Sequence, residues 1–595
     1  MEEKQERLHL VVFPWLAMGH LIPFFHLSKL IAQKGHKVSF ISTPRNLQRL
    51  PKIPPHSSLS SLITLVPLLL PHVENLPEDA ESSVDVPYNK QQLLKRAFDL
   101  LESPMADFLE SSAPDWVVYD YASHWLPPLA AKLGVSRAYF CLFTAACMAA
   151  VGPPSLLVNG QDKRTKTEDF TVVPPWIPFK SDMAFRYHEV AKYVHENESG
   201  TPDTVRFGIA VRDSDVVLMR SSEEFEPEWF ELLRALYGRS KPVLPVGFLP
   251  PLVEEKSTRV KDWLDKQRVN SVVYVALGTE ATLSQEELTE LALGLELSGL
   301  PFFWVLRDPP ESTRAVSEML PDGFLERVRD RGMVHFGWAP QVWILSHDSV
   351  GGFLTHCGWN SMIEGLGFGK VLILFPMLND QGLNARLANG KGLGVEIPRN
   401  ELDGSFTRDA VAEFVRLAMV EEEGEMVRRR VKEMKGIAYI HKCGYVHCDL
   451  KPENVLLVEN EDEDVPRRII AKVADLGLAK KKDEVHERWR GKPMYLAPET
   501  LRFNEQEEPS DIWALGCIVL EMITGVPARN HFYDEDSNRI VVVDGAVPKI
   551  PEDEISGVAE DFLGCCLDNY MDRSTAEKLL SHPFVAEKYL HIDFT

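Results

Sequence analysis

Between positions 338 and 381 lie aromatic, acidic and amide residues, and a strand-to-helix turn, whose chemistry could bind a ligand. The segment THCGWNS (355–361) lies where an apolar run ends and a helical pattern begins. Because the first amide groups of a helix lack partners and its dipole is positive there, this turn favours a diphosphate. The indole of Trp338 offers a flat face for a base. The carboxylate of Glu364 can accept hydrogen bonds from two neighbouring hydroxyls, such as those of a ribose.

The segment as a whole resembles a known motif. From Trp338 to Gln381 it reads WAPQVWILSHDSVGGFLTHCGWNSMIEGLGFGKVLILFPMLNDQ, which is similar from end to end to the donor-site motif of plant family 1 UDP-sugar glycosyltransferases. The resemblance implies that uracil stacks on Trp338 beside Gln341, that His356 and its neighbours bind the diphosphate, and that Asp380 and Gln381 hold the sugar. The UDP-sugar-binding residues that it implies are Gly278, Thr279, Trp338, Ala339, Gln341, His356, Gly358, Trp359, Asn360, Ser361, Glu364, Asp380 and Gln381.

The stretch GLGFGK (365–370) within this motif allows another interpretation, as a kinase glycine-rich loop or a P-loop. Its spacing fits neither, since Lys370 stands where a third glycine would fall and no GK[ST] follows. We interpret these glycines as turn residues. A separate loop, residues 278–280, follows an apolar run and precedes a helical pattern. In the family this loop meets the phosphates and the sugar.

The N-terminal half supplies a candidate general base. His20 lies in FPWLAMGHLIP (13–23), and Asp120 ends DWVVYD (115–120). An imidazole can take a proton from an acceptor hydroxyl, and a carboxylate behind it fixes the tautomer and stabilises the imidazolium. By resemblance these two residues are the catalytic pair of an inverting, single-displacement reaction, in which UDP leaves from the face opposite the attacking oxygen. The family needs no metal, and no DxD-type carboxylate pair is evident.

Alternating strand and helix patterns must position these residues. The strand-like runs are 8–13, 37–42, 115–120, 211–221, 271–279, 301–307, 332–338, 351–358 and 370–376. This alternation predicts an α/β protein with parallel sheets covered by helices on both faces. The set is too long for one sheet and divides near the proline-rich stretch 241–255. The resemblance implies a GT-B fold of two Rossmann-like domains, with residues 1–245 binding the acceptor and residues 246–435 binding the UDP-sugar.

The residues after 436 have a different character and resemble the large lobe of a plant MAP-kinase-kinase-kinase-type protein kinase. In GYVHCDLKPENVLL (444–457) the resemblance implies that Asp449 is the base, Lys451 a phosphate contact and Asn454 a magnesium ligand. Asp475, in ADLGLA, would be the second metal ligand. Further matches are the APE motif with Glu499, its partner Arg573, and Asp511 on the helix that anchors the catalytic loop. We therefore expect a mainly α-helical large-lobe fragment over residues 436–595.

Two departures from the kinase pattern argue against phosphoryl transfer. Cys448 replaces the usual arginine of the HRD motif, so a phosphorylated activation loop would lose its partner. More seriously, no glycine-rich loop, strand lysine or helix glutamate of a small lobe precedes Gly436. Because phosphoryl transfer depends mostly on positioning and charge stabilisation, we expect no kinase activity. ATP and magnesium would be cofactors only if this part were functional, whereas glycosyl transfer should need none.

The junction EMKGIAYIH (433–441) leaves alternatives open. The chain could be a glycosyltransferase carrying a kinase fragment, a serine/threonine kinase or pseudokinase module, or the product of two merged neighbouring genes. The glycosyltransferase family normally continues past a sequence like VRRRVKEMKG with a helix that crosses back to the N-terminal domain. Here a different sequence stands in place of that helix, so we expect a weaker clamp between the two domains and reduced stability or activity.

The composition of the chain argues against some classes of binding partner. The net charge of −24 disfavours nonspecific binding to nucleic acid or anionic membranes. No apolar run is long enough to span a bilayer and no secretory signal is evident, so we expect a cytoplasmic protein with reduced cysteines. His441, Cys443, His447 and Cys448 could suggest zinc, but no second ligand pair has finger-like spacing.

The expected substrates follow from the resemblance alone. The stretch 13–46 is similar to the plant branch that often extends an existing glycoside of a flavonoid or terpenoid. We therefore expect a UDP-sugar, with glucose or rhamnose as the sugar, and a small plant secondary metabolite or its glycoside as acceptor. The sequence names no protein partner for the kinase fragment.

Overall fold

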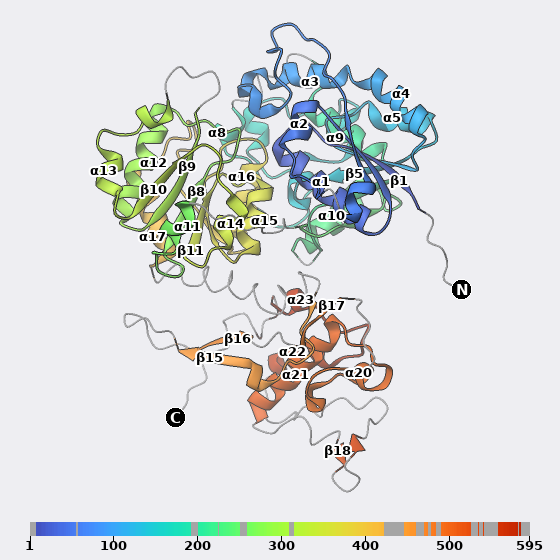
Figure 1. Cartoon of the computed structure of the whole chain (residues 1–595), viewed down its shortest axis with the longest axis vertical. Coiled ribbons are helices and arrows are strands. Elements are labelled where there is room, and N and C mark those ends of the chain that lie inside the picture. Colours follow the sequence, from blue (N-terminus) through green and yellow to red (C-terminus); the bar gives the residue numbers. More distant parts are fainter. Residues whose placement is uncertain are drawn as a thin grey trace. The chain divides into compact units, whose positions relative to one another are not determined.

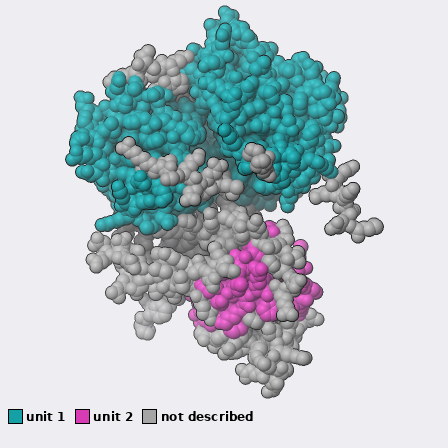
Figure 2. Space-filling view, in the orientation of Figure 1, with its two compact units in different colours: residues 1–428 teal, residues 429–595 magenta. Residues whose placement is uncertain are grey.

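The computed structural model describes two compact units, residues 1–428 and residues 429–595 (Figures 1 and 2). The described residues are 7–54, 57–191, 200–223, 225–249, 259–308, 315–421, 445–459, 469–473, 478–482, 489–524, 533–534, 539–540, 557–580, 582 and 584.

The first unit begins with a seven-stranded parallel sheet in the order β3-β2-β1-β4-β5-β6-β7. Its strands are β1 (His9–Phe13), β2 (Lys37–Ser42), β3 (Ile63–Pro67), β4 (Trp116–Tyr119), β5 (Ser136–Cys141), β6 (Val216–Met219) and β7 (Val243–Pro245). The order reverses between β1 and β4, and such a switch point opens a crevice at the carboxyl ends of the strands. His20 follows β1 and Asp120 follows β4, so the topology brings the two candidate catalytic residues to this crevice.

Helices connect and cover this sheet (Figure 1). They are α1 (Met18–Gln33), α2 (Pro44–Arg49), α3 (Gln91–Asp99), α4 (Glu102–Ser112), α5 (Leu126–Lys132), α6 (Ala145–Val151), α7 (Pro154–Val158), α8 (Tyr187–Val190), α9 (Asp203–Arg212) and α10 (Pro227–Tyr237). The core is aromatic where α1 meets the strands: Phe24 packs edge-on against Phe140, and Phe25 against Phe40. This packing fixes α1, whose first turn carries His20.

A second parallel sheet in the same unit has the order β10-β9-β8-β11-β12-β13. Its strands are β8 (Val272–Ala276), β9 (Phe302–Leu306), β10 (Gly332–Phe336), β11 (Val350–Thr355), β12 (Val371–Leu374) and β13 (Gly394–Glu396). Its helices are α11 (Arg259–Leu264), α12 (Gln285–Ser298), α13 (Phe324–Val328), α14 (Gln341–Ser346), α15 (Trp359–Gly367), α16 (Gln381–Gly390) and α17 (Arg408–Met419). The switch point lies between β8 and β11, whose following turns contain Gly278 and His356.

Local sequence explains the ends of α12. Ser284 caps it, since its Oγ accepts from the backbone amide of Glu287 at 3.1 Å while the Glu287 carboxylate accepts from the amide of Ser284 at 2.9 Å. The helix ends before Gly299, which has φ +73°. α12 and α17 pack together on the core formed by Trp304, Leu354 and their neighbours.

These two parallel sheets with their helices confirm the predicted pair of Rossmann-like α/β domains. Several details differ from the sequence prediction. The expected strand over 211–221 is shorter, because α9 extends to Arg212 and only Val216–Met219 pair in the sheet. Strands β3, β5, β7 and β13 were not anticipated, since they are short or lie beside proline or polar residues.

The second unit contains short strands and four described α-helices. The strands are β14 (Tyr445–Val446), β15 (Val455–Glu459), β16 (Ile469–Val473), β17 (Lys480–Lys481), β18 (Tyr533–Asp534) and β19 (Arg539–Ile540). The helices among the described residues are α20 (Pro498–Phe503), α21 (Glu508–Thr524), α22 (Gly557–Leu567) and α23 (Ala576–Leu580). Helices α21 and α22 share an apolar core that includes Trp513, Phe562 and Leu563.

Candidate active site

The imidazole of His20 lies against the carboxylate of Asp120 in the crevice of the first sheet. Nδ1 of His20 is 2.7 Å from Oδ2 of Asp120. A carboxylate can only accept, so Nδ1 carries the proton and Nε2 of the neutral ring has a lone pair for an incoming hydroxyl proton. Asp120 is 1% exposed, and its oxygens also accept from the backbone amides of Trp15 at 3.1 Å and Tyr121 at 2.8 Å. The carboxylate is therefore fixed by the backbone, and it fixes the ring.

The electrostatic setting raises the pKa of His20 above its ordinary value. Burial is the largest single influence and lowers this pKa, but the charge and hydrogen bond of Asp120, with the nearby carboxylates Glu280 and Asp380, outweigh it. Asp380 and Glu280 belong to the second sheet's domain, so carboxylates of that domain lie near the imidazole of His20. A base with a raised pKa takes up a proton more readily, which suits general-base catalysis.

An aromatic cluster borders His20 on the acceptor side. Its ring centroid lies 6.0 Å from Tyr121 and 6.0 Å from Phe143. Phe207 stacks on Tyr121 at 4.3 Å and meets Phe143 edge-on at 5.1 Å. Phe143 and Phe207 are only half-buried, so these rings present apolar surface beside the base. Such a surface suits a planar or polycyclic acceptor.

Gln341, the first residue of α14, forms the hydrogen bonds that join the residues predicted to bind the base and the ribose. Its Nε2 donates to Oε2 of Glu364 at 2.8 Å and to Oγ of Ser361 at 3.0 Å, and its Oε1 accepts from the Tyr274 hydroxyl at 3.3 Å. Burial raises the pKa of Glu364, although Gln341 and Arg220 oppose the shift. Gln341 therefore orients a half-buried carboxylate that can accept from ribose hydroxyls.

Trp338 is 68% exposed, which is unusual for a residue that is normally buried. Its ring has the guanidinium of Arg307 at 5.7 Å from its centroid, and Arg307 also donates to the backbone oxygen of Gly278. Ala339, which follows it, is buried and accepts from the amide of Gln341 at 2.9 Å. The exposed indole is available as a stacking platform.

His356 lies between two glycines at the turn after β11. A Cβ on Gly278, whose φ is +77°, would lie 2.5 Å from its Nε2, and a Cβ on Gly358 would also lie 2.5 Å from it. Both positions must therefore lack a side chain for the ring to fit. Burial, and then the charge of Arg307, lowers the pKa of His356 to about 4, so its ring is neutral near pH 7. Thr279 follows Gly278 in the turn after β8.

The start of α15 makes contacts that the sequence did not predict. Asn360 is predicted to donate to the diphosphate; in this structure its Nδ2 donates to the backbone oxygen of Gly19 at 2.6 Å and its Oδ1 accepts from Arg220. Nε1 of Trp359 donates to the backbone oxygen of Arg220 at 2.8 Å. In this structure both side chains contact the first sheet's domain, and the backbone amides at the helix start remain as candidate phosphate donors.

Asp380 and Gln381 lie at the start of α16. The Asp380 carboxylate accepts from Nδ2 of Asn384 at 2.7 Å, and burial raises its pKa despite that bond and the nearby His20. The Gln381 side chain accepts from the amides of Met377 at 2.9 Å and Leu378 at 2.8 Å. Its oxygen therefore shapes the loop, and its Nε2 is the group that could meet a sugar.

Some candidate site residues were not found by sequence reasoning. Arg220, Arg307, Tyr121, Phe143 and Phe207 were missed because each lies outside the motifs that carry the resemblance. Glu280 was predicted only to lie in the 278–280 loop. Its Oε1 accepts from Oγ of Ser83, in the first sheet's domain, at 2.6 Å. A basic residue directly after a buried strand, as in VVLMR (216–220), was the signal available for Arg220.

In the second unit the side chains of Asp449, Lys451 and Asn454 lie close together. Asp449 binds Lys451 and accepts from Nδ2 of Asn454 at 3.2 Å. Asp511 accepts from the amides of His447 at 2.7 Å and Cys448 at 3.0 Å. These contacts hold the loop around Asp449.

The structure describes some of the other kinase-like residues and not the rest. The expected ion pair joins Arg573 to Glu499 at 2.7 Å. Burial raises the pKa of the Cys448 thiol to about 12, so it is not a thiolate. Asp475, His441 and Cys443 lie outside the described residues.

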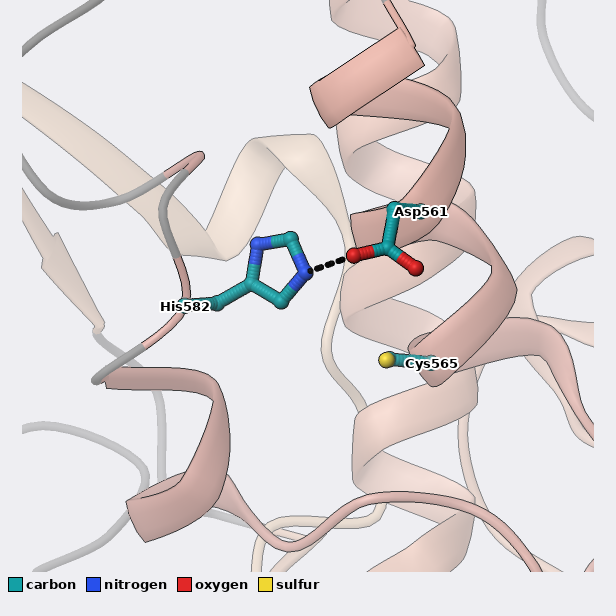
Figure 3. A group of neighbouring side chains, drawn as sticks. All are labelled: Asp561, Cys565 and His582. Atoms are coloured by element: carbon teal, nitrogen blue, oxygen red, sulfur yellow. Dashed lines mark hydrogen bonds and ion pairs between the residues drawn. The ribbon is translucent and has the colours of Figure 1, made fainter.

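One group in the second unit has the composition of a metal site. Asp561, Cys565 and His582 place their ligand atoms within 4.8 Å of one another (Figure 3). However, Nδ1 of His582 accepts from the amide of Phe584 at 3.1 Å, so the proton of a neutral ring lies on Nε2, which donates to Asp561 at 3.0 Å. The nitrogen that faces the group is thus a donor to a carboxylate. We interpret the group as a histidine–aspartate pair.

The fold and the site together define a class of protein. Two Rossmann-like domains, a histidine–aspartate pair at one switch point and a diphosphate-type turn at the other are the parts of a GT-B glycosyltransferase. Among the described residues no helix is long and apolar enough to cross a membrane.

Comparison with known proteins identifies the family. The model for UDP-glucoronosyl and UDP-glucosyl transferase matches residues 229–423, and the protein kinase domain model matches residues 407–585. UDP-glycosyltransferase 91C1 of Arabidopsis thaliana is 59% identical over 73% of this chain and 94% of its own length. Soyasaponin III rhamnosyltransferase of Glycine max is 42% identical over 72% of this chain and 91% of its own length. The chain belongs to the plant UDP-glycosyltransferase family and carries a protein kinase segment after it.

Solved structures agree with this assignment. The crystal structure of TcCGT1 in complex with UDP superposes with a TM-score of 0.60, at 26% identity, over 72% of this chain and 94% of that one. Phytolacca americana UGT2 complexed with UDP-2fluoro-glucose and pterostilbene gives 0.56, at 25% identity, over 73% and 96%. The chain is therefore an enzyme that transfers a glycosyl group from a UDP-sugar, without a cofactor for that reaction. The 407–423 overlap of the two family models falls on α17, which packs in the glycosyltransferase core.

Proposed function

We propose that this enzyme transfers glucose or rhamnose from its UDP-sugar to a hydroxyl of a small plant secondary metabolite or of its glycoside. The observation that carries the proposal is the His20–Asp120 pair at 2.7 Å beside the aromatic cluster of Tyr121, Phe143 and Phe207. A base that faces apolar rings suits a hydroxyl on a planar or polycyclic acceptor. The soyasaponin rhamnosyltransferase, at 42% identity, supports both a rhamnose donor and a glycosylated acceptor.

The reaction is a single in-line displacement. Nε2 of His20 takes the proton of the acceptor hydroxyl, whose oxygen attacks the anomeric carbon while the bond to UDP breaks on the opposite face. Asp120 holds the tautomer and stabilises the imidazolium that forms. The start of α15 and the neutral His356 stabilise the charge that develops on UDP. The configuration at the anomeric carbon inverts.

The donor-binding roles are part of the same proposal. Uracil stacks on Trp338, Glu364 accepts from the ribose, and Asp380 with Gln381 meets the sugar hydroxyls. The domain limits 1–245, 246–435 and 436–595 also belong to it. They are supported by β7, which ends at Pro245, and by the division into compact units near Arg428. The compartment we propose is the cytoplasm.

The test compares the full-length wild type with His20→Ala, using UDP-glucose and UDP-rhamnose with flavonoid and triterpenoid acceptors, both free and glycosylated. We expect one donor to dominate, an inverted anomeric configuration by NMR, and loss of turnover in the variant. His72→Ala, which changes an exposed histidine of the same domain, is the matched control and should keep full activity. Retention of configuration, or full turnover in His20→Ala, would refute the mechanism.

No kinase activity is proposed for residues 436–595. The Asp449 loop is formed, but the sequence that precedes Gly436 belongs to the glycosyltransferase and supplies no small lobe. Half of an ATP site cannot hold the nucleotide for in-line transfer.

A further inference from the structure

Arg220 is a buried cation with an unusual set of partners. It follows β6 directly and is 2% exposed. Its guanidinium donates to Oδ1 of Asn360, to the backbone oxygen of Phe248 at 2.9 Å and to that of Leu249 at 3.3 Å. Within the described part of the chain it forms no ion pair with a carboxylate. Burial lowers its pKa to about 10, although Glu364 opposes the shift. Because an unpaired buried charge is costly, such an arginine needs a structural or functional reason.

The guanidinium decides how the amide of Asn360 is oriented. Arginine has donors only, so the atom of Asn360 that faces it must be the oxygen. The nitrogen then faces the backbone oxygen of Gly19, to which it donates at 2.6 Å. The amide therefore has one orientation, and Arg220 sets it. The backbone of Arg220 is held in turn, because its carbonyl accepts from the indole of Trp359 at 2.8 Å.

The oxygen of Gly19 needs this donor because of a proline. Gly19 lies in the first turn of α1, where its oxygen would normally accept from the amide four residues later. That residue is Pro23, which lies inside the helix and has no N–H. The Gly19 oxygen thus lacks its helical partner, and Asn360 supplies one from the other domain. Gly19 immediately precedes His20.

We propose that Arg220 is a positioning residue that, through the Asn360 amide and the Gly19 oxygen, holds the His20 turn in register with the donor-binding helix α15. We call the three residues Arg220, Asn360 and Gly19 the strut. The strut joins the domain of the general base to the start of the helix that binds the diphosphate. It keeps the imidazole in line with the anomeric carbon of the bound donor. This inference rests on the proposed roles of His20 and α15.

If the strut positions His20, its loss should lower kcat and leave the Kd for UDP almost unchanged. A shift of the base by about 1 Å can cost on the order of 10²-fold in rate. In full-length Arg220→Gln we expect kcat to fall about 10- to 100-fold while the Kd for UDP, measured by calorimetry, changes less than about threefold. Arg220→Lys keeps the charge but not the planar fork, so it should recover little of the lost kcat.

Pro23→Ala is a second, independent variant. It gives α1 the missing amide, which competes with Asn360 for the Gly19 oxygen. We expect kcat to fall by roughly threefold or more, with an unfolding temperature that is unchanged or higher because a helix gains a hydrogen bond. A loss of turnover at undiminished stability cannot come from partial unfolding. The matched control for Arg220→Gln is Arg164→Gln. Arg164 also donates to two backbone oxygens, those of Ala150 and Val151, but within its own domain.

The pH dependence gives a further readout. The charged groups that act on His20 are Asp120, Glu280 and Asp380. If the His20 turn moves, its bond to Asp120 weakens and burial lowers its pKa, so the acidic limb of kcat/KM should shift to lower pH in Arg220→Gln.

The outcomes separate the possibilities. If the Kd for UDP rises in parallel with the loss of kcat/KM and Arg220→Lys restores it, Arg220 is a charge for the diphosphate and the strut is wrong. If Pro23→Ala and Arg220→Gln keep the wild-type kcat and acidic limb, the strut is also wrong. If the wild type itself neither binds UDP nor turns over, the proposed function fails instead, which is a distinct result.

Discussion

The most informative single change is Asp120→Asn, because it removes one charge and keeps the shape. The carboxylate of Asp120 accepts on both oxygens: from His20 at 2.7 Å and Trp15 at 3.1 Å on Oδ2, and from Tyr121 at 2.8 Å on Oδ1. An amide has a single oxygen. If that oxygen faces His20, the NH₂ group meets the amide of Tyr121. If it faces Tyr121, the NH₂ group meets Nδ1 of His20 and favours the tautomer with its proton on Nε2.

The size of the effect follows from this geometry. In the flipped orientation Nε2 already has a proton and cannot accept one from the substrate, so general-base catalysis is lost. That contribution is typically about 10²–10⁴-fold, or roughly 3–5 kcal/mol of activation free energy. One backbone amide also loses its buried acceptor, which should lower the free energy of unfolding by about 1–3 kcal/mol.

The variant should also move the pH profile. The base works when His20 is neutral, so kcat/KM rises as the pH increases through its pKa. The carboxylate raises that pKa against the lowering effect of burial. Its removal lowers the pKa, so the acidic limb should move to lower pH even though the plateau falls.

The assay is the initial rate of UDP release from about pH 5 to pH 9, with thermal unfolding as the control for folding. Asp115→Asn is the matched substitution, since Asp115 accepts from the backbone amide of His9 at 2.7 Å at the start of the neighbouring strand, away from the base. A folded Asp120→Asn enzyme with kcat/KM within threefold of wild type and an unmoved acidic limb would refute the role of Asp120.

The remaining predictions concern the donor site and the kinase segment. Glu364→Gln should weaken UDP binding by about 10–100-fold in calorimetry, because a charged acceptor for the ribose is lost; an unchanged Kd would contradict this role. Gly278→Ala should weaken UDP binding at least about tenfold, since its Cβ would lie 2.5 Å from His356, whereas Gly299→Ala has a similar φ of +73° and open space and should not. Calorimetry of the full chain should detect no ATP binding in the micromolar range, and a micromolar Kd would overturn the inactive assignment. Long cDNA reads across codons 433–440 should carry both sides if the fusion is real, and their absence would favour two merged genes.

The contacts between the two Rossmann-like domains bear on the prediction that the family's C-terminal helix is replaced in this chain. Arg386 on α16 binds Glu189 of α8 and, at 3.3 Å, Glu396 after it in the chain. All three side chains are nearly buried. Removing one member of such an ion pair would leave an unpaired buried charge and strongly destabilise the protein. With the strut, these contacts join the domains through residues that precede position 421. They therefore provide domain contacts that do not depend on the replaced segment.

The sequence by itself determined the family-level features of this protein. Strand and helix periodicity is local, so alternating runs were enough to predict parallel α/β domains. The donor motif was recognisable because its chemistry is concentrated in one stretch, Trp338 to Gln381. His20 and Asp120 were found only through resemblance, since they are far apart in the chain. Their contact is explained by the switch point between β1 and β4.

Only the tertiary structure decided what these residues touch. Asn360 is predicted to bind phosphate, and the structure adds that its side chain bridges Arg220 and Gly19. Pro23 has no N–H, so the Gly19 oxygen lacks its hydrogen-bond donor within α1. Asn360 of the other domain supplies that donor. Likewise, the requirement for glycine at 278 follows from the position of His356 on a neighbouring strand's turn. Periodicity and motifs report local preference, whereas hydrogen-bond partners and steric room depend on how distant segments pack, and that is fixed only when the chain folds.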